Sequence, residues 1–95
     1  MKKFMLLHIG FEQPTPEVMD AWKAWFADVS GEHCGFMGGR EITADGASEL
    51  PWGPDAMTGY SLIEAESMDA AVAIAKSNPF ITAIRVYEIR EHDGG

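Results

Sequence analysis

The chain has few cysteines, few basic residues and no long hydrophobic run, and each shortage excludes something. A single cysteine, Cys34, rules out an intrachain disulfide, so a reducing compartment such as the cytoplasm is expected. Seven basic residues against 15 acidic ones leave a net charge of −8, which repels phosphate backbones and anionic lipid surfaces. No apolar run approaches the roughly 20 residues of a membrane helix. We therefore expect neither nucleic acid nor a membrane as a partner.

Motifs for metal or cofactor chemistry are also missing. The three histidines, His8, His33 and His92, stand singly, without His-x-x-x-His or Cys-x-x-Cys spacing. The glycines of "MGGRE" lack the Gly-x-Gly-x-x-Gly pattern of a phosphate-binding turn, and they fit a strand bulge better. We therefore predict no metal site and no cofactor, and little supports a nucleophilic Cys34.

Apolar side chains, in contrast, are abundant. They make up 46% of the 95 residues, with three Trp, five Phe and six Met. A single domain of this length, residues 1–95, buries only about 60–65% of its unfolded surface, so oligomerisation would help to cover the rest. The stripe of Trp22, Trp25 and Phe26, at helical spacing, is interpreted as core.

Hydrophobic periodicity and cap residues predict the order of elements. Thr15 caps a first helix with Pro16 at its first position, Ser67 caps a second helix, and an Asp-Gly pair marks a hairpin turn. The predicted elements are a buried strand at 4–9, a helix at 16–29, a weak strand at 34–42, a hairpin at 40–50, a strand at 60–65, a helix at 68–78 and a strand at 84–90.

This β-α-β-(hairpin)-β-α-β order predicts a ferredoxin-like α+β sandwich with an antiparallel sheet. In that topology the strands at 4–9 and 60–65 are central, and these are the most apolar strands here. Two helices can cover only one face of the sheet, whereas the strand at 4–9 is apolar on both faces. A second copy packed sheet to sheet would cover the other face, so we predict a homodimer.

Three segments resemble the YciI-like proteins, also called YCII-related or DGPF-domain proteins: "KKFMLLHIG", "GPDAMTGYSLIEAESMDAAVAIAKSNP" and "IRVYEIR". The resemblance covers most of the chain and implies one domain that forms a dimeric α+β barrel from ferredoxin-like protomers. In some members a His–Asp pair has suggested enzymatic activity. Where such members carry a histidine on helix one, this chain has Trp22 or its neighbours, and its signature loop has "WGPD" in place of DGPF.

Two ionisable residues are the candidates for catalysis. His8 lies in a central strand, where a pKa near neutrality suits a general base; the alternative is a hydrogen-bonded core or interface histidine. Asp55 follows the Gly-Pro of the signature loop. Its carboxylate would orient His8 or bind a polar ligand group, or it would instead bond its own backbone in the turn.

Four further residues are candidates for binding a ligand. Trp52 would form a pocket wall or lid, or it would be buried against helix one or a partner subunit. Tyr60, Arg85 and Tyr87 lie on predicted strands, the last two on one face. Arg85 would hold a carboxylate in a bidentate contact, or it would pair with an acidic residue of the chain.

Two functional hypotheses follow. The first is a small cofactor-free acid–base enzyme of hydrolase or isomerase type, with a pocket between sheet and helices or at the dimer seam, lined by His8, Asp55 and Tyr87. The second is a non-catalytic module that binds a small metabolite or another protein. An ionisable residue in a buried strand favours the first, and the absence of a complete catalytic motif favours the second. The fold alone hosts unrelated activities and does not decide between them.

Overall fold

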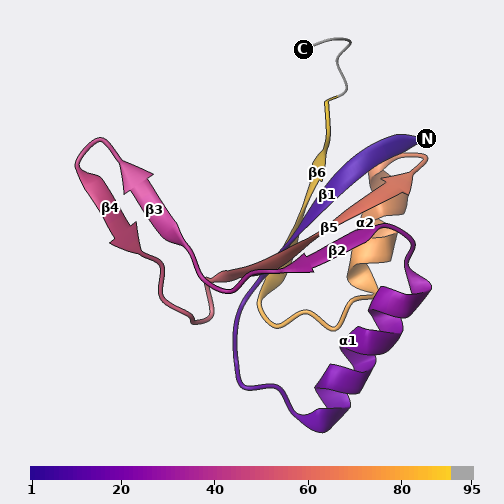
Figure 1. The fold of residues 1–95 in the computed structure, drawn as a ribbon. Helices are drawn as coiled ribbons and strands as arrows, with labels where there is room; N and C mark the ends of the chain where they lie inside the picture. The colour runs from indigo at the N-terminus through magenta and orange to yellow at the C-terminus, as the bar shows by residue number, and fades with distance from the viewer. Residues whose placement is uncertain (91–95) are drawn as a thin grey trace.

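The computed structural model describes residues 1–90, and residues 91–95, which follow the predicted strand at 84–90 and include His92, lie outside the described residues. Its body is a four-stranded antiparallel sheet in the order β2-β5-β1-β6, with both helices on one face (Figure 1). The strands are β1 (Lys2–Ile9), β2 (Glu32–Gly35), β5 (Met57–Ala65) and β6 (Ala83–Glu88). β1 and β5 are central, as predicted, and the architecture is α+β and compatible with a ferredoxin-like fold.

The first helix begins at the predicted residues. The Thr15 hydroxyl accepts a hydrogen bond from the Val18 N–H (3.3 Å), and proline opens α1 (Pro16–Asp28). Val29 is the C-cap, and its own N–H donates to the Trp25 carbonyl (3.0 Å). α1 thus ends one residue before the predicted boundary, and Val29 already has extended backbone angles.

The second helix also begins where the cap residue predicts. The Ser67 hydroxyl accepts from the Ala70 N–H (3.2 Å) at the start of α2 (Met68–Lys76). α2 ends two residues before the predicted boundary at 78. The cause is local, because the Ser77 hydroxyl donates to the Ile74 carbonyl (2.6 Å) and closes the last turn.

The core fills the space between the helices and the sheet. Side chains alternate along a strand, so Phe4 and Leu6 of β1 point to the helices and are fully buried. Trp25 is the buried side chain of α1, whereas α2 contributes alanines that allow it to pack closely on the sheet. The core cluster consists of Phe4, Leu6, Trp25, Ile63, Ala65, Ala71 and Ala75.

The predicted hairpin forms from β3 (Arg40–Thr43) and β4 (Gly46–Glu49), and it extends away from the four-stranded sheet (Figure 1). The weak strand predicted at 34–42 is therefore wrong as one element: β2 ends at Gly35 and β3 starts at Arg40. The glycines at 38 and 39 lie in the gap, and glycine weakens strand pairing. Every residue of β3 and β4 is exposed.

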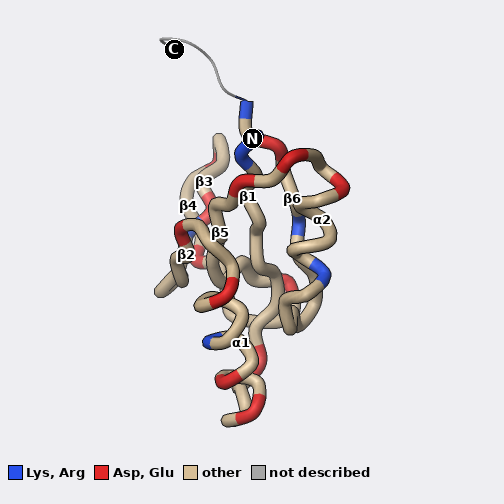
Figure 2. The backbone as a smooth tube through the Cα atoms, turned by 90° about the vertical axis from the view of Figure 1, so that its right-hand side faces the viewer, with Lys and Arg blue, Asp and Glu red and all other residues tan. Residues whose placement is uncertain are grey.

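Acidic residues are spread over the body, including along α1 and its flanking segments (Figure 2). The basic residues are few: Lys2 and Lys3 are neighbours at the start of β1, and the others are spread along the chain. No helix among the described residues is long and apolar enough to cross a membrane.

Candidate functional site

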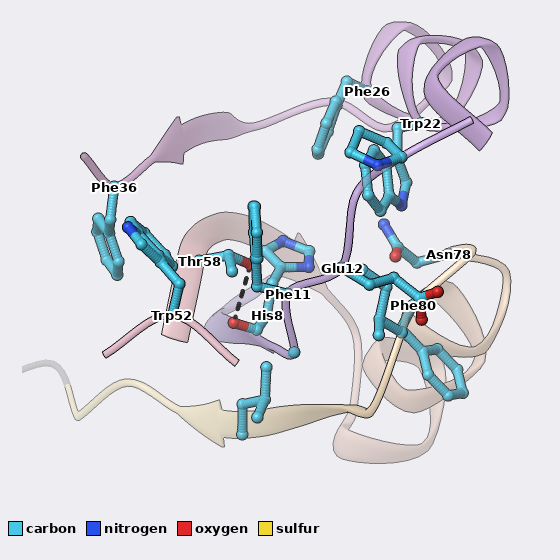
Figure 3. A pocket seen from close by; sticks show the side chains of 14 residues that line it. His8, Phe11, Glu12, Trp22, Phe26, Phe36, Trp52, Thr58, Asn78 and Phe80 are labelled. Atoms are coloured by element: carbon cyan, nitrogen blue, oxygen red, sulfur yellow. Dashed lines mark hydrogen bonds between the residues drawn. The ribbon is translucent and has the colours of Figure 1, made fainter. Parts of the chain in front are cut away.

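A cavity of about 280 Å³ lies where β1 ends, on the helix-covered side of the sheet (Figure 3). Its wall is apolar and rich in aromatic rings, and its polar side chains are few. The aromatic lining residues are Phe11, Trp22, Phe26, Phe36, Trp52 and Phe80. The polar side chains in the lining are His8, Glu12, Thr58 and Asn78. Small-molecule sites have this composition, with apolar walls and a few placed polar groups.

A β-bulge shapes the cavity at the end of β1. The pairing of β1 with β5 shifts between His8, which faces Gly59, and Ile9, which faces Met57. Thr58 is therefore the extra residue of β5, and bulges of this kind redirect side chains near functional sites. The Thr58 hydroxyl donates weakly to the His8 carbonyl (3.4 Å) and lines the cavity beside it (Figure 3).

The loop at 50–56, between β4 and β5, is tied to the segment that follows β1. Gly10 has a φ of +116°, which favours glycine, and its N–H donates to the Ala56 carbonyl (2.7 Å). The Phe11 N–H donates to the Gly53 carbonyl (2.9 Å), and the Phe11 and Trp52 rings lie 5.3 Å apart. The loop thereby supplies one wall of the cavity.

His8 is held from behind by a short chain of hydrogen bonds across three strands. Its Nε2 lies 2.8 Å from the Ser61 hydroxyl, and that hydroxyl lies 2.7 Å from Nδ1 of His33. Nε2 of His33 donates to the Val29 carbonyl at the end of α1 (2.9 Å). Ser61 is fully buried. This chain fixes the plane of the His8 ring at the edge of the cavity.

Aromatic rings surround both imidazoles on the helix side. The His8 ring meets the rings of Trp25 (6.0 Å) and Phe26 (6.2 Å) edge to face. Burial, followed by the nearness of His33, lowers the pKa of His8 from its ordinary value of 6.5. His8 is therefore a neutral imidazole at neutral pH, and its Nδ1 has no hydrogen-bond partner among the described residues.

Asn78 carries a second unused polar group in the cavity lining. The residue is 5% exposed, and its Nδ2 is the one buried side-chain nitrogen or oxygen of the described residues without a hydrogen-bond partner. Leaving such a group unpaired costs about 1–3 kcal/mol. A hydrogen-bond acceptor inside the cavity would recover that free energy.

Two of the predicted site residues, His8 and Trp52, line the cavity together. Asp55 is exposed and is not part of the lining. The predicted pairing of Asp55 with His8 does not form, because the ring is oriented by Ser61 instead. The backbone beside Asp55 instead holds the loop to the segment before β6, because the Pro54 carbonyl accepts a hydrogen bond from the Thr82 hydroxyl (2.6 Å).

The three other predicted residues lie on the opposite face of the sheet. Tyr60 and Arg85 both pair with Leu7, whose side chain points away from the helices, and Tyr87 is two residues beyond Arg85 on the same face. The predicted pocket shared by His8 and Tyr87 is therefore wrong. Strand alternation separates them by the thickness of the sheet.

The interpretation of the first-helix stripe as core holds only for Trp25. Trp22 and Phe26 line the cavity instead. The Trp22 indole donates to the Pro79 carbonyl (2.8 Å), and the Trp25 indole donates to Ser77 (2.9 Å). These two bonds tie α1 to the segment that follows α2 and set the width of the cavity.

His33, Ser61 and Asn78 were not predicted as site residues. His33 and Ser61 could have been identified from the alternation of side chains along paired strands. In the sheet Ser61 pairs with His33 on one side and with Leu6 on the other, so all three face the helices. That relation depends on register, which residue types alone do not give. Asn78 carries no pattern that marks it.

Among residues 1–90, no group of three or more His, Cys, Asp or Glu side chains is placed to hold a metal ion. Comparisons of the chain with models of known protein families, with curated proteins and with solved structures found no match. The chemistry of the site is therefore argued from its own geometry.

Proposed function

We propose that the cavity binds a small, neutral ring compound and that His8 acts on it as a cofactor-free general base and acid, in a hydrolysis or an isomerisation. The observation that supports this most is the position of His8, a neutral imidazole with an unpartnered nitrogen in the lining of an aromatic-walled cavity.

The cavity supports a ligand of ring size. A dry cavity of about 150 Å³ accommodates benzene, so about 280 Å³ has room for a substituted ring. The Glu12 carboxylate in the lining and the net charge of −8 disfavour an anion. The Asn78 amide calls for an acceptor, such as a carbonyl oxygen, on the ligand.

His8 is placed to act as an acid–base group, whereas Ser61 is not placed to act as a nucleophile. A general base works best when its pKa lies near the working pH and its basic form is populated, and the lowered pKa of His8 keeps the imidazole unprotonated. Ser61 is 0% exposed and its hydroxyl lies between two imidazoles, so a ligand cannot reach it. The proton that His8 removes belongs to the ligand or to a water molecule beside it.

A non-catalytic binding module is the second candidate. Its support is that the His8 ring hydrogen-bonds Ser61 alone among the described residues, and no carboxylate of the lining pairs with it. In this alternative the same cavity holds a metabolite without turnover, and His8 supplies one polar contact.

A thermal-shift screen with neutral aromatic and heterocyclic carbonyl compounds tests the proposal. A hit should raise Tm of the wild type, raise it less in Asn78→Ala, and raise it fully in Asp55→Asn, the control outside the cavity. Turnover of the hit that His8→Gln abolishes supports the enzyme, whereas binding without turnover supports the module. The proposal fails if no compound stabilises the wild type.

We also propose that a second copy of the chain covers the outer face of the sheet, giving the dimeric α+β barrel that the resemblance to YciI-like proteins implies. The outer face, made by Met5, Leu7, Tyr60, Leu62, Arg85 and Tyr87, carries apolar side chains that no helix covers. An isolated two-stranded hairpin is marginal in water, so β3 and β4 would also gain from a partner. Leu62→Lys should convert a dimer into a monomer in analytical ultracentrifugation; a monomeric wild type contradicts the proposal.

A further inference from the structure

The His8–Ser61–His33 chain leads from the cavity to the end of α1. The three side chains come from neighbouring strands, β1, β5 and β2, and all point to the helix side of the sheet. Their contacts are short: 2.8 Å from His8 Nε2 to the Ser61 hydroxyl, 2.7 Å from that hydroxyl to His33 Nδ1, and 2.9 Å from His33 Nε2 to the Val29 carbonyl. Such distances are those of well-formed hydrogen bonds.

The hydrogen bond between His33 and the Val29 carbonyl determines where each proton of the His8–Ser61–His33 hydrogen-bond chain lies. A carbonyl only accepts, so the contact with Val29 places a proton on Nε2 of His33. In neutral His33 the other nitrogen, Nδ1, then accepts, and the Ser61 hydroxyl donates to it. The hydroxyl has one proton, so its oxygen accepts from Nε2–H of His8. This assignment leaves a lone pair on Nδ1 of His8.

We infer that Ser61 and His33 form a proton relay behind His8, which fixes Nδ1 of His8 as the basic nitrogen and carries the positive charge away from the cavity. The inference rests on the proposed function for the source of the proton. Ser61 and His33 act through His8 and are positioning residues.

The relay conserves one proton at each step. A proton from the ligand or from water bonds to Nδ1 of His8. His8 gives its Nε2 proton to the Ser61 oxygen, and Ser61 gives its own hydroxyl proton to Nδ1 of His33. His8 ends neutral with its proton on Nδ1, and His33 ends as an imidazolium that still donates to Val29. The reverse sequence returns the proton to the product.

The surroundings favour a positive charge on His33 over one on His8. Val29 is the C-cap of α1, and the carbonyls at a helix C-terminus carry partial negative charge. The His33 ring also lies 5.0 Å from the Phe26 ring and 5.5 Å from the Trp25 ring, within the range of cation–π attraction. The charged groups near His8 are His33, which disfavours a second cation, and Glu12 in the cavity lining.

The tautomers of the two histidines test the relay in the protein without ligand. Long-range ¹H–¹⁵N NMR spectra of the imidazoles distinguish a protonated from a bare ring nitrogen, and they are recorded from about pH 8 down to about pH 5. We expect wild-type His8 and His33 to carry their protons on Nε2 at the high-pH end. We also expect the His8 signals to respond to replacement of His33, because the Ser61 hydroxyl links the two rings.

Ser61→Ala should abolish both features at His8: the single tautomer is lost, and the response to His33 disappears. His33→Gln should therefore change the His8 ring signals when Ser61 is present and leave them unchanged in the Ser61→Ala background. Thr58→Val removes another hydroxyl beside His8, on the same strand, and should leave the His8 tautomer unchanged. If Ser61→Ala does not fold, the tautomer of His8 in the wild type and the His8 ring signals of His33→Gln still test the relay.

A proton on Nδ1 of wild-type His8 at high pH would overturn the relay, as would a His8 tautomer that Ser61→Ala leaves unchanged. These results are independent of ligand binding. A failed ligand screen with the expected tautomers would contradict the proposed function and leave the proton assignment in place, whereas a hit with the wrong tautomer would do the opposite.

Discussion

The two faces of the central sheet are made by the same strands, residue by residue, yet they differ in nearly every property. The helix side holds Phe4, Leu6 and Ser61 fully buried and ends in an aromatic cavity. The outer side presents Leu7 and Tyr87 to its surroundings, and neither helix of residues 1–90 covers it. This difference is the reason why we propose a ligand site on the covered face and a second copy of the chain on the other face.

Adjacent leucines give the sharpest test of this comparison. Leu6→Ala should lower the free energy of unfolding by about 2–5 kcal/mol, because Leu6 is fully buried in the core. Leu7→Ala removes the same atoms from the outer face and should cost less, with a loss that depends on protein concentration if a second copy covers that face. Urea denaturation at several protein concentrations measures both. Equal losses that do not depend on concentration would erase the distinction between the faces.

A glycine at the edge of the cavity should show the next largest effect. Gly10 has a φ of +116°, and a Cβ there would also collide with Thr82. Gly10→Ala should therefore lower the free energy of unfolding by about 1–3 kcal/mol. Gly38→Ala is the control, since a Cβ there meets nothing within 4 Å. Comparable losses for both variants in thermal or urea unfolding would mean that the turn after β1 is not constrained.

The Phe11–Trp52 contact should contribute less to stability. The rings lie 5.3 Å apart, and a pair of this kind is worth about 0.5–1.5 kcal/mol beyond its buried area. Phe11→Leu should lower the unfolding free energy modestly and change the fluorescence of Trp52. A double-mutant cycle with Trp52→Leu isolates the pair. A coupling energy of zero would show that the loop at 50–56 is not held against the cavity.

His8 should contribute to the way in which the free energy of unfolding changes with pH. The folded protein holds the pKa of His8 below 6.5, so the unfolded chain binds more protons in the interval between the two pKa values. Stability should therefore be fully present above pH 6.5 and fall as the pH drops below it. His8→Gln should flatten that fall in urea titrations at several pH values. An unchanged slope in the variant would contradict the pKa direction.

Much of the fold follows from local signals in the sequence. The cap residues Thr15 and Ser67 begin their helices as predicted, and the predicted hairpin forms with its turn at Ala44 and Asp45, one residue before the centre expected from the Asp-Gly pair. The central position of β1 and β5 was predicted from their apolar runs. These predictions hold because each depends on a few neighbouring residues.

The site was predicted only in part, because it depends on register. His8 and Trp52 could be selected by residue type and motif. The link from His8 to Ser61 and His33 depends on which residues of three strands stand opposite one another. Arg85 was selected by the same criteria as His8 but lies on the other face, since one step along a strand reverses the direction of a side chain.

The most direct test of the account is to map where a small-molecule hit binds by NMR, using the indole N–H signals of the tryptophans and the ring signals of the tyrosines. We expect a hit from the thermal-shift screen to shift Trp22 and Trp52, which line the cavity, together with His8. Tyr60 and Tyr87 on the outer face should not move. Shifts confined to the two tyrosines, with the cavity signals unchanged, would place the site on the wrong face of the sheet and contradict the account.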